Sequence, residues 1–231
     1  MSDYERYGDY DNTDDDLPKS KSPIILILKI LIASICIGVV GLLAVRLIIF
    51  NNYPDSVKLV SFDDTLKEHY LEKNGDIEIK TQKIRAPYDD PDLGYFFSDH
   101  LYVIDGCDQL QITVRYNTAN CKRISDELAI EGGIDPDSQN SFGYCLVDNY
   151  GRVYDNVTIA AFDSRSTYRY VKLIVNGVDF SPEENPPEWI RLDVYVNGAD
   201  RVEPYTALCI YENHANYSSF ESYELSQKER P

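Results

Sequence analysis

The chain has 231 residues and a formal net charge of −17. Residues 51–231 carry 17 basic and 32 acidic side chains, so we expect an acidic surface that repels phosphate backbones, which excludes nucleic acid as a partner. The sequence lacks G-x-x-x-x-G-K-[ST], G-x-G-x-x-G, H-E-x-x-H and G-x-S-x-G, so no nucleotide, metal or other cofactor is predicted.

Residues 1–22 form a polar stretch with 3 basic and 7 acidic side chains and no apolar period. Such a composition cannot bury enough apolar surface to fold, so a disordered acidic tail is predicted.

The next stretch, from Ile24 to Phe50, is apolar throughout and holds only two charges, Lys29 and Arg46. A bilayer core of about 30 Å needs roughly 20 helical residues. A soluble core helix would have a polar stripe, and a cleaved signal peptide would be shorter and would end in a small-residue site. We therefore predict an uncleaved signal anchor, a transmembrane helix over residues 23–50.

Basic residues near the membrane predict its orientation. Three lie on the N-terminal side of the apolar centre, Lys19, Lys21 and Lys29, whereas Arg46 and Lys58 lie on the other. Positive residues favour the inside, so we expect a cytoplasmic N-terminus and an extracytoplasmic C-terminal domain in the cell membrane. Lys19, Lys21, Lys29 and Arg46 mark the membrane boundaries.

Ser34 and Gly38 form a small-xxx-small pair that could bring two anchors together. A lone anchor is the favoured interpretation, and the oligomeric state is left open.

Residues 51–76 are expected to form a membrane-proximal segment, with a short helix over Asp64–Glu72 and a turn at Asn74-Gly75. From residue 77 the apolar period is two, as in half-buried strands. The clearest runs are Ile77–Lys80, Leu110–Tyr116, Val157–Ala161, Tyr170–Val175 and Ile190–Val196.

Turn signals separate these runs, among them Asp105-Gly106, Asn176-Gly177 and Asn197-Gly198. The fold class predicted is mainly β, an antiparallel β-sandwich over residues 77–215 with a polar C-terminal tail over 216–231. A short helix over Lys122–Ile130 and a proline-rich connection over Ser181–Glu188 interrupt the pattern. Trp189, which follows that connection, is interpreted as a core or rim anchor.

Four cysteines fall in the domain, Cys107, Cys121, Cys145 and Cys209. An extracytoplasmic location permits disulfides, and four cysteines allow three pairings. A strand over Leu110–Tyr116 would hold Cys107 and Cys121 too far apart to bond, so that pair is disfavoured. Free buried thiols are an equally good interpretation.

The acidic loop clusters, Asp89-Asp90-x-Asp92 and Asp135-x-Asp137, are interpreted as solvated turns rather than calcium ligands. The three histidines, His69, His100 and His214, lie far apart in sequence and predict no metal site.

Aromatic residues give one positive indication of binding. Tyr168, Tyr170 and Lys172 share the polar side of one predicted strand, and Tyr195 lies on the polar side of another. If the two strands pair, these side chains form a tyrosine-rich recognition face. The alternative is that tyrosine is common here only because it favours strands.

The chain resembles a group of uncharacterised bacterial cell-envelope proteins. The resemblance covers roughly residues 23–212 and rests on the single anchor and on segments such as DHLYVIDGCDQLQITVRYN, FGYCLVDNYGRVYDN and WIRLDVYVNG. It implies an immunoglobulin-like β-sandwich outside the membrane, and it brings no catalytic or binding residues with it.

Together these features predict a non-enzymatic, single-pass membrane protein whose sandwich binds a protein or a cell-envelope component. The first alternative is a transmembrane sensor with a short cytoplasmic tail. A membrane-tethered hydrolase is a weaker one, since no carboxylate pair stands out.

Overall fold

The computed structural model describes residues 23–51, 54–84, 95–165, 167–178, 187–200, 202–212 and 220–231. The chain divides into two compact units between Ile49 and Phe50, and each unit is described by itself. Residues 1–22, with Lys19, Lys21 and the predicted disordered tail, lie outside the described residues, as do the first acidic cluster and His214.

The first unit contains helix α1 (Pro23–Asn51) up to Ile49. Its stretch Leu26–Arg46 is 21 residues long, has a mean hydropathy of 2.7 and buries none of its residues. The predicted helix is confirmed as one that is long and apolar enough to cross a membrane, and its exposure argues against a soluble core helix. Lys29 and Arg46 both lie on it, and a Cβ added at Gly38 or Gly41 would meet nothing within 4 Å.

The second unit is a β domain with two antiparallel sheets. In the six-stranded sheet the order is β10 (Glu221–Ser222), β1 (Ile79–Lys83), β2 (Phe96–Ile104), β3 (Gln109–Asn117), β7 (Tyr168–Asn176) and β6 (Val157–Ser164). In the four-stranded sheet the order is β5 (Val153–Tyr154), β4 (Phe142–Asp148), β8 (Trp189–Val196) and β9 (Thr206–Glu212). The predicted mainly β, two-sheet architecture is confirmed.

Three helices in the described part of the domain complete the fold, namely α2 (Asp55–Lys58), α3 (Asp64–Glu72) and α4 (Thr118–Glu127). Helix α3 has the predicted bounds, and its N-cap Asp63 accepts a hydrogen bond from the amide of Leu66 at 2.9 Å. Helix α4 begins four residues before the predicted start, where Asn117 caps it.

The main core lies between the two sheets. Apolar side chains from β2, β3 and β7 meet those from β4, β8 and β9, and many are fully buried, including Leu101, Ile112, Leu173, Leu146, Leu192 and Ile210. A second cluster lies on the other side of the six-stranded sheet and includes Val60, Leu66, Ile79, Tyr102 and Ile104.

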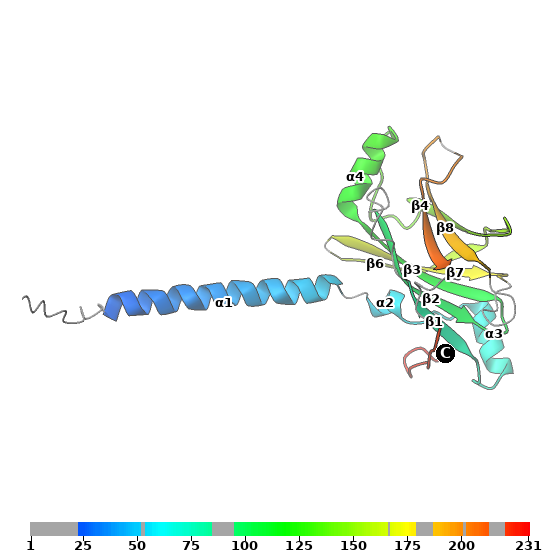
Figure 1. Ribbon diagram of the computed structural model, residues 1–231, viewed down its shortest axis with the longest axis horizontal. Coiled ribbons are helices and arrows are strands. Elements are labelled where there is room, and N and C mark those ends of the chain that lie inside the picture. Colours follow the sequence, from blue (N-terminus) through cyan, green and yellow to red (C-terminus); the bar gives the residue numbers. More distant parts are fainter. Residues whose placement is uncertain are drawn as a thin grey trace, which may run out of the picture. The chain divides into compact units, whose positions relative to one another are not determined.

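The six-stranded sheet is therefore covered on both faces. In Figure 1 the β4–β8 pair and helices α2 and α3 lie on opposite sides of β2 and β3. The packed domain includes residues 54–76 and 220–231, which were expected to lie outside the sandwich as a membrane-proximal segment and a polar tail. Both segments carry apolar residues that the sheet buries.

Candidate functional site: a strapped polar face and an open aromatic face

Uncharged polar side chains line the face of the six-stranded sheet that points away from the main core. Gln109, Gln111 and Thr113 alternate on β3 with the core residues, and Lys172 is the register partner of Thr113 on β7. All four are at most 1% exposed. We call this surface the polar face, and the chain itself covers it.

The covering segment is residues 54–63, which follow closely on α1 in sequence and are called the strap. The Gln111 side chain pairs with both backbone groups of Ser61: its Oε1 accepts from the amide at 2.9 Å, and its Nε2 donates to the carbonyl at 2.7 Å. Thr113 Oγ1 donates to the carbonyl of Val57 at 2.7 Å. Strand side chains thus bind the strap through its backbone, much as a neighbouring strand would.

Three further hydrogen bonds hold the strap, one at its middle and two at its C-terminal end. The hydroxyl of Tyr102 on β2 donates to the carbonyl of Lys58 at 2.6 Å. At the C-terminal end of the strap Asp63 accepts hydrogen bonds from Gln109 at 3.0 Å and from Asn176 at 3.1 Å. The start of α3 is therefore fixed to β3 and β7.

The C-terminal residues 220–229 hold the strap from outside and are called the clasp. Glu229, only 7% exposed, accepts from the amide of Val60 at 2.8 Å, from the amide and hydroxyl of Ser226 at 2.8 and 2.6 Å, and from the hydroxyl of Tyr223. Burial alone would raise the pKa of the Glu229 carboxyl, but these hydrogen bonds outweigh it and hold the pKa below its ordinary value.

Lys172 is the unusual member of the polar face. Its side chain is fully buried, and its Nζ lies 4.0 Å from the centre of the Tyr102 ring, with no hydrogen-bond partner among the described residues. Burial lowers the pKa of Lys172 to about 7, although the negative charge of Glu229 opposes the change. A buried amine without an acceptor is costly when charged, which marks this residue as a candidate functional group.

The predicted recognition face of Tyr168, Tyr170, Lys172 and Tyr195 is wrong. Tyr170 and Lys172 are 0% exposed, because the outward side of β7 is covered, and Tyr168 is half-buried with the Arg115 guanidinium 5.2 Å from its ring centre. Tyr195 belongs to β8, which lies in the other sheet. The alternation placed each residue on the correct side of its strand, but the two strands do not pair.

The outer side of the four-stranded sheet has a different character. On β8, Trp189, Arg191, Asp193 and Tyr195 alternate with core residues and point away from the core. The Arg191 guanidinium lies 2.9 Å from the Asp193 carboxylate and 5.7 Å from the Trp189 ring centre. We call this surface the open face: Arg191 on it is exposed and Trp189 and Tyr195 are half-buried, while Asp193, which is bound to the Arg191 guanidinium, is only 2% exposed.

The cysteines are all free thiols. Cys145 and Cys209 lie beside β8 on the flanking strands, opposite Asp193 and Arg191 respectively. Burial raises the pKa of Cys107 and of Cys121 to about 11, and it also raises the pKa of Cys145. Thiols with raised pKa values are poor nucleophiles, so these three are interpreted as packing residues.

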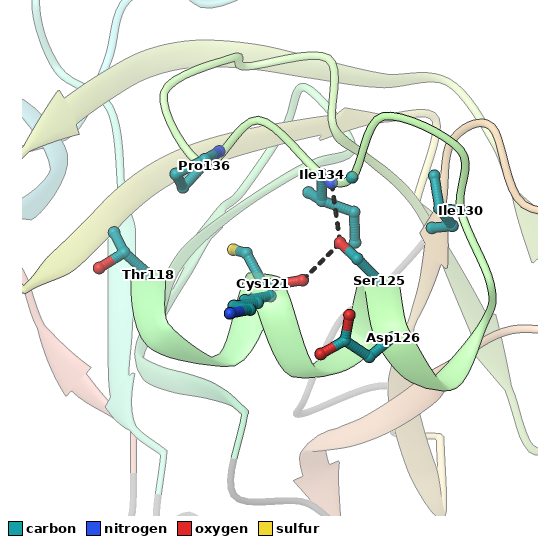
Figure 2. Close-up of a pocket in the computed structure, with 9 residues that line it drawn as sticks. Thr118, Cys121, Ser125, Asp126, Ile130, Ile134 and Pro136 are labelled. Atoms are coloured by element: carbon teal, nitrogen blue, oxygen red, sulfur yellow. Dashed lines mark hydrogen bonds between the residues drawn. The ribbon is translucent and has the colours of Figure 1, made fainter.

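A cavity of about 410 Å³ lies between α4 and the loop that follows it. Figure 2 shows Cys121, Ser125 and Asp126 on the helix, with Ile130 and Ile134 on the loop. The Ser125 hydroxyl donates to the carbonyl of Cys121 at 2.7 Å and accepts from the amide of Ile134 at 2.8 Å. Its hydrogen bonds thus hold the loop onto the helix rather than pointing toward a ligand.

Metal ligands do not gather in the described part of the chain, where no three His, Cys, Asp or Glu side chains converge. Within the second acidic cluster Asp137 binds Arg169 at 2.7 Å, and its pKa is held low chiefly by that hydrogen bond.

Comparison of the chain with protein-family models, with curated proteins and with solved structures gives no match.

Proposed function

We propose that this protein is a membrane-anchored binding module whose β domain engages a partner protein through the open face. The observation that carries the proposal is the contrast between the two outer faces of the domain. The chain's own strap and clasp occupy the polar face, whereas the open face presents Trp189, Arg191 and Tyr195 beyond the core.

The chemistry of the open face suits a protein partner. Tryptophan, tyrosine and arginine are enriched among the few residues that carry most of the binding energy of protein interfaces, where they pack closely against the partner near the centre of the contact. Small molecules instead favour concave pockets, and the cavity beside α4 lies on another part of the domain. The raised thiol pKa values and the internal hydrogen bonds of that cavity support a non-enzymatic role.

We also propose the topology that the basic residues favour, with the N-terminus in the cytoplasm and the domain outside. An immunoglobulin-like relationship stays a prediction that rests on the sequence segments. Sheets of six and four strands exceed the seven to nine strands of immunoglobulin domains, so the strap-bearing sheet would be an elaborated one.

Site-specific photocross-linking in cells tests the binding function. A photoreactive residue replaces Trp189 or Tyr195 in the full chain, and Leu71, which is 70% exposed on α3, carries the matched control. We expect the same protein adduct from both open-face positions and not from position 71. No protein adduct at either position, or an identical adduct at position 71, would overturn the proposal; the first result would favour a cell-envelope saccharide.

A transmembrane sensor is the second candidate function, and the strap favours it. Because the strap follows α1 almost directly and is bonded to β3, a change in the domain can act on the chain close to the anchor. Deleting residues 2–20 separates the two functions: a sensor loses its output, whereas the cross-links from Trp189 and Tyr195 remain.

A further inference from the structure

The strap and the clasp meet at the hydrogen bond between Val60 and Glu229, on the side of the sheet where Lys172 is buried. An apolar residue at position 172 would fill the space below Tyr102 without a buried amine. The amine has three donors and makes no hydrogen bond to a described residue, so its charged form would be stabilised only by the Tyr102 ring and by the more distant Glu229.

We propose that protonation of Lys172 releases the strap and the clasp from the polar face, so that acidification lengthens the chain between the anchor and the β domain. The inference is independent of the partner-binding function of the open face.

The charged amine must reach water or an acceptor, and the surrounding elements decide how it does so. Strand β7 is hydrogen-bonded on both sides, by β3 and by β6, so it cannot move alone. The strap is held by side-chain hydrogen bonds and by the buried side chains of Val57 and Val60, and the clasp also pairs with β1 through the two-residue strand β10. Both lie at the periphery of the domain, where segments open at lower cost than a central strand does.

Release would have a geometric consequence. The strap has ten residues, and ten residues of extended chain span about 35 Å. While the strap is docked on the polar face, only residues 52 and 53 link α1 to it in sequence. Released, it would let the domain reach correspondingly farther from the membrane.

Other charged and titratable groups lie on the elements around Lys172. Those on the surrounding elements are Tyr102 on β2, Lys58 on the strap, Asp163 on β6, and Tyr223 and Glu229 on the clasp. Burial raises the pKa of Tyr102 to about 12 and also raises the pKa of Tyr223, while the pKa of Glu229 is lowered. Between pH 6 and pH 9 both tyrosines therefore stay neutral and Glu229 stays ionised.

His100 needs a control, because its ring stacks on Tyr102 with centroids 6.2 Å apart and its Nδ1 lies 2.7 Å from Asp99. A His100→Gln variant removes that ring and keeps a polar side chain.

Hydrogen–deuterium exchange of the full chain in lipid nanodiscs tests the inference. The peptide covering residues 54–63 is followed at pH 6, 7, 8 and 9, corrected for the intrinsic effect of pH, with a β8 peptide as the internal reference. A lysine of pKa about 7 when docked and ordinary pKa when released predicts that strap protection falls about tenfold from pH 8 to pH 6. The fall should level off below pH 7.

The variants assign the effect. Lys172→Met, which keeps the length of the stem and removes the amine, should give strap protection that does not change with pH, and His100→Gln should behave as the unsubstituted chain does. The inference is overturned if strap protection in the unsubstituted chain is constant from pH 9 to pH 6, if His100→Gln abolishes the fall, or if Lys172→Met retains it. The first two outcomes are measured on chains that keep Lys172, so the inference stays testable even if the Lys172→Met chain fails to fold.

Discussion

Glu229 and Lys172 are two buried ionisable residues in the same layer, yet their charges are compensated very differently. Glu229 accepts four hydrogen bonds, three of them within the clasp and one from the strap amide of Val60. Lys172 has none from the described residues. A satisfied buried charge stabilises the arrangement around it, whereas an unsatisfied one destabilises it, so the two residues should respond oppositely to neutralisation.

Replacing Glu229 with Gln should therefore weaken the domain. The amide nitrogen of glutamine would face N–H and O–H groups that now donate hydrogen bonds to the carboxylate. We therefore expect a loss of about 2 kcal/mol in the free energy of unfolding at pH 7. Urea unfolding measures it, with exposed Glu224→Gln as the matched control. An equal effect of the two substitutions would contradict this role for Glu229.

The pH dependence of that difference follows from the lowered pKa of Glu229. A carboxyl with a lowered folded-state pKa contributes stability above its ordinary pKa and loses it as the pH falls through the folded value. The gap between the unsubstituted chain and Glu229→Gln should therefore be full at pH 7 and shrink as the pH falls below about 4.5.

Among the elements, β3 illustrates what alternation can and cannot predict. Its apolar residues, such as Ile112 and Val114, were correctly expected on the core side. Its polar residues were expected to face water, because alternation does not say what covers the second face. The uncharged character of Gln109, Gln111 and Thr113 was the available signal, since amides and hydroxyls can be satisfied by a backbone at little cost.

The strap itself could not be predicted from its own sequence. Its large apolar residues, Val57, Leu59, Val60 and Phe62, follow no clear helical or strand period. Its position depends on hydrogen bonds to residues about 50 and 169 positions away, which local patterns do not encode. The clasp was interpreted as a polar tail for the same reason.

Gln111→Leu tests the bond between strap and sheet. Leucine cannot pair with the amide and carbonyl of Ser61, so docking of the strap should weaken by about 2 kcal/mol, or about thirtyfold in local exchange protection. Hydrogen exchange of residues 54–63 at pH 8 is the measurement. Thr158→Val is the matched control, because Thr158 lies in the same row of the sheet on the edge strand and is exposed.

If the strap exchanges equally slowly in Gln111→Leu and Thr158→Val, the Gln111 side chain does not hold it. The main core should be unaffected in both variants, since Gln111 points away from it. Protection of β4 and β8 peptides therefore serves as the test that the sandwich itself remains folded.

At the scale of the whole molecule, the sequence predicted the long apolar helix and the mainly β class of the domain but not the division of strands between sheets. Strands β7 and β8 are neighbours in sequence, and for each of them the sequence correctly predicted which side chains face the core. They lie in different sheets. This single topological fact separates Tyr170 from Tyr195 and removes the predicted recognition face.

The position of the domain relative to the membrane is the remaining whole-molecule prediction. The basic residues Lys19, Lys21 and Lys29 precede the apolar centre, and only Arg46 and Lys58 lie close behind it. We therefore expect Val202→Cys, at a position 95% exposed in the domain, to react with a membrane-impermeant maleimide on intact cells.

The unsubstituted chain provides the background for that experiment, because Cys107 and Cys209 are themselves partly exposed thiols. Labelling above this background should be complete before permeabilisation, since a domain outside the membrane gains no further access when the cell is opened. Labelling of Val202→Cys only after permeabilisation would place the domain in the cytoplasm. That result would mean that the basic residues near the membrane do not set the orientation of this chain. The acidic side chains, which dominate the net charge of the domain, do not enter the prediction.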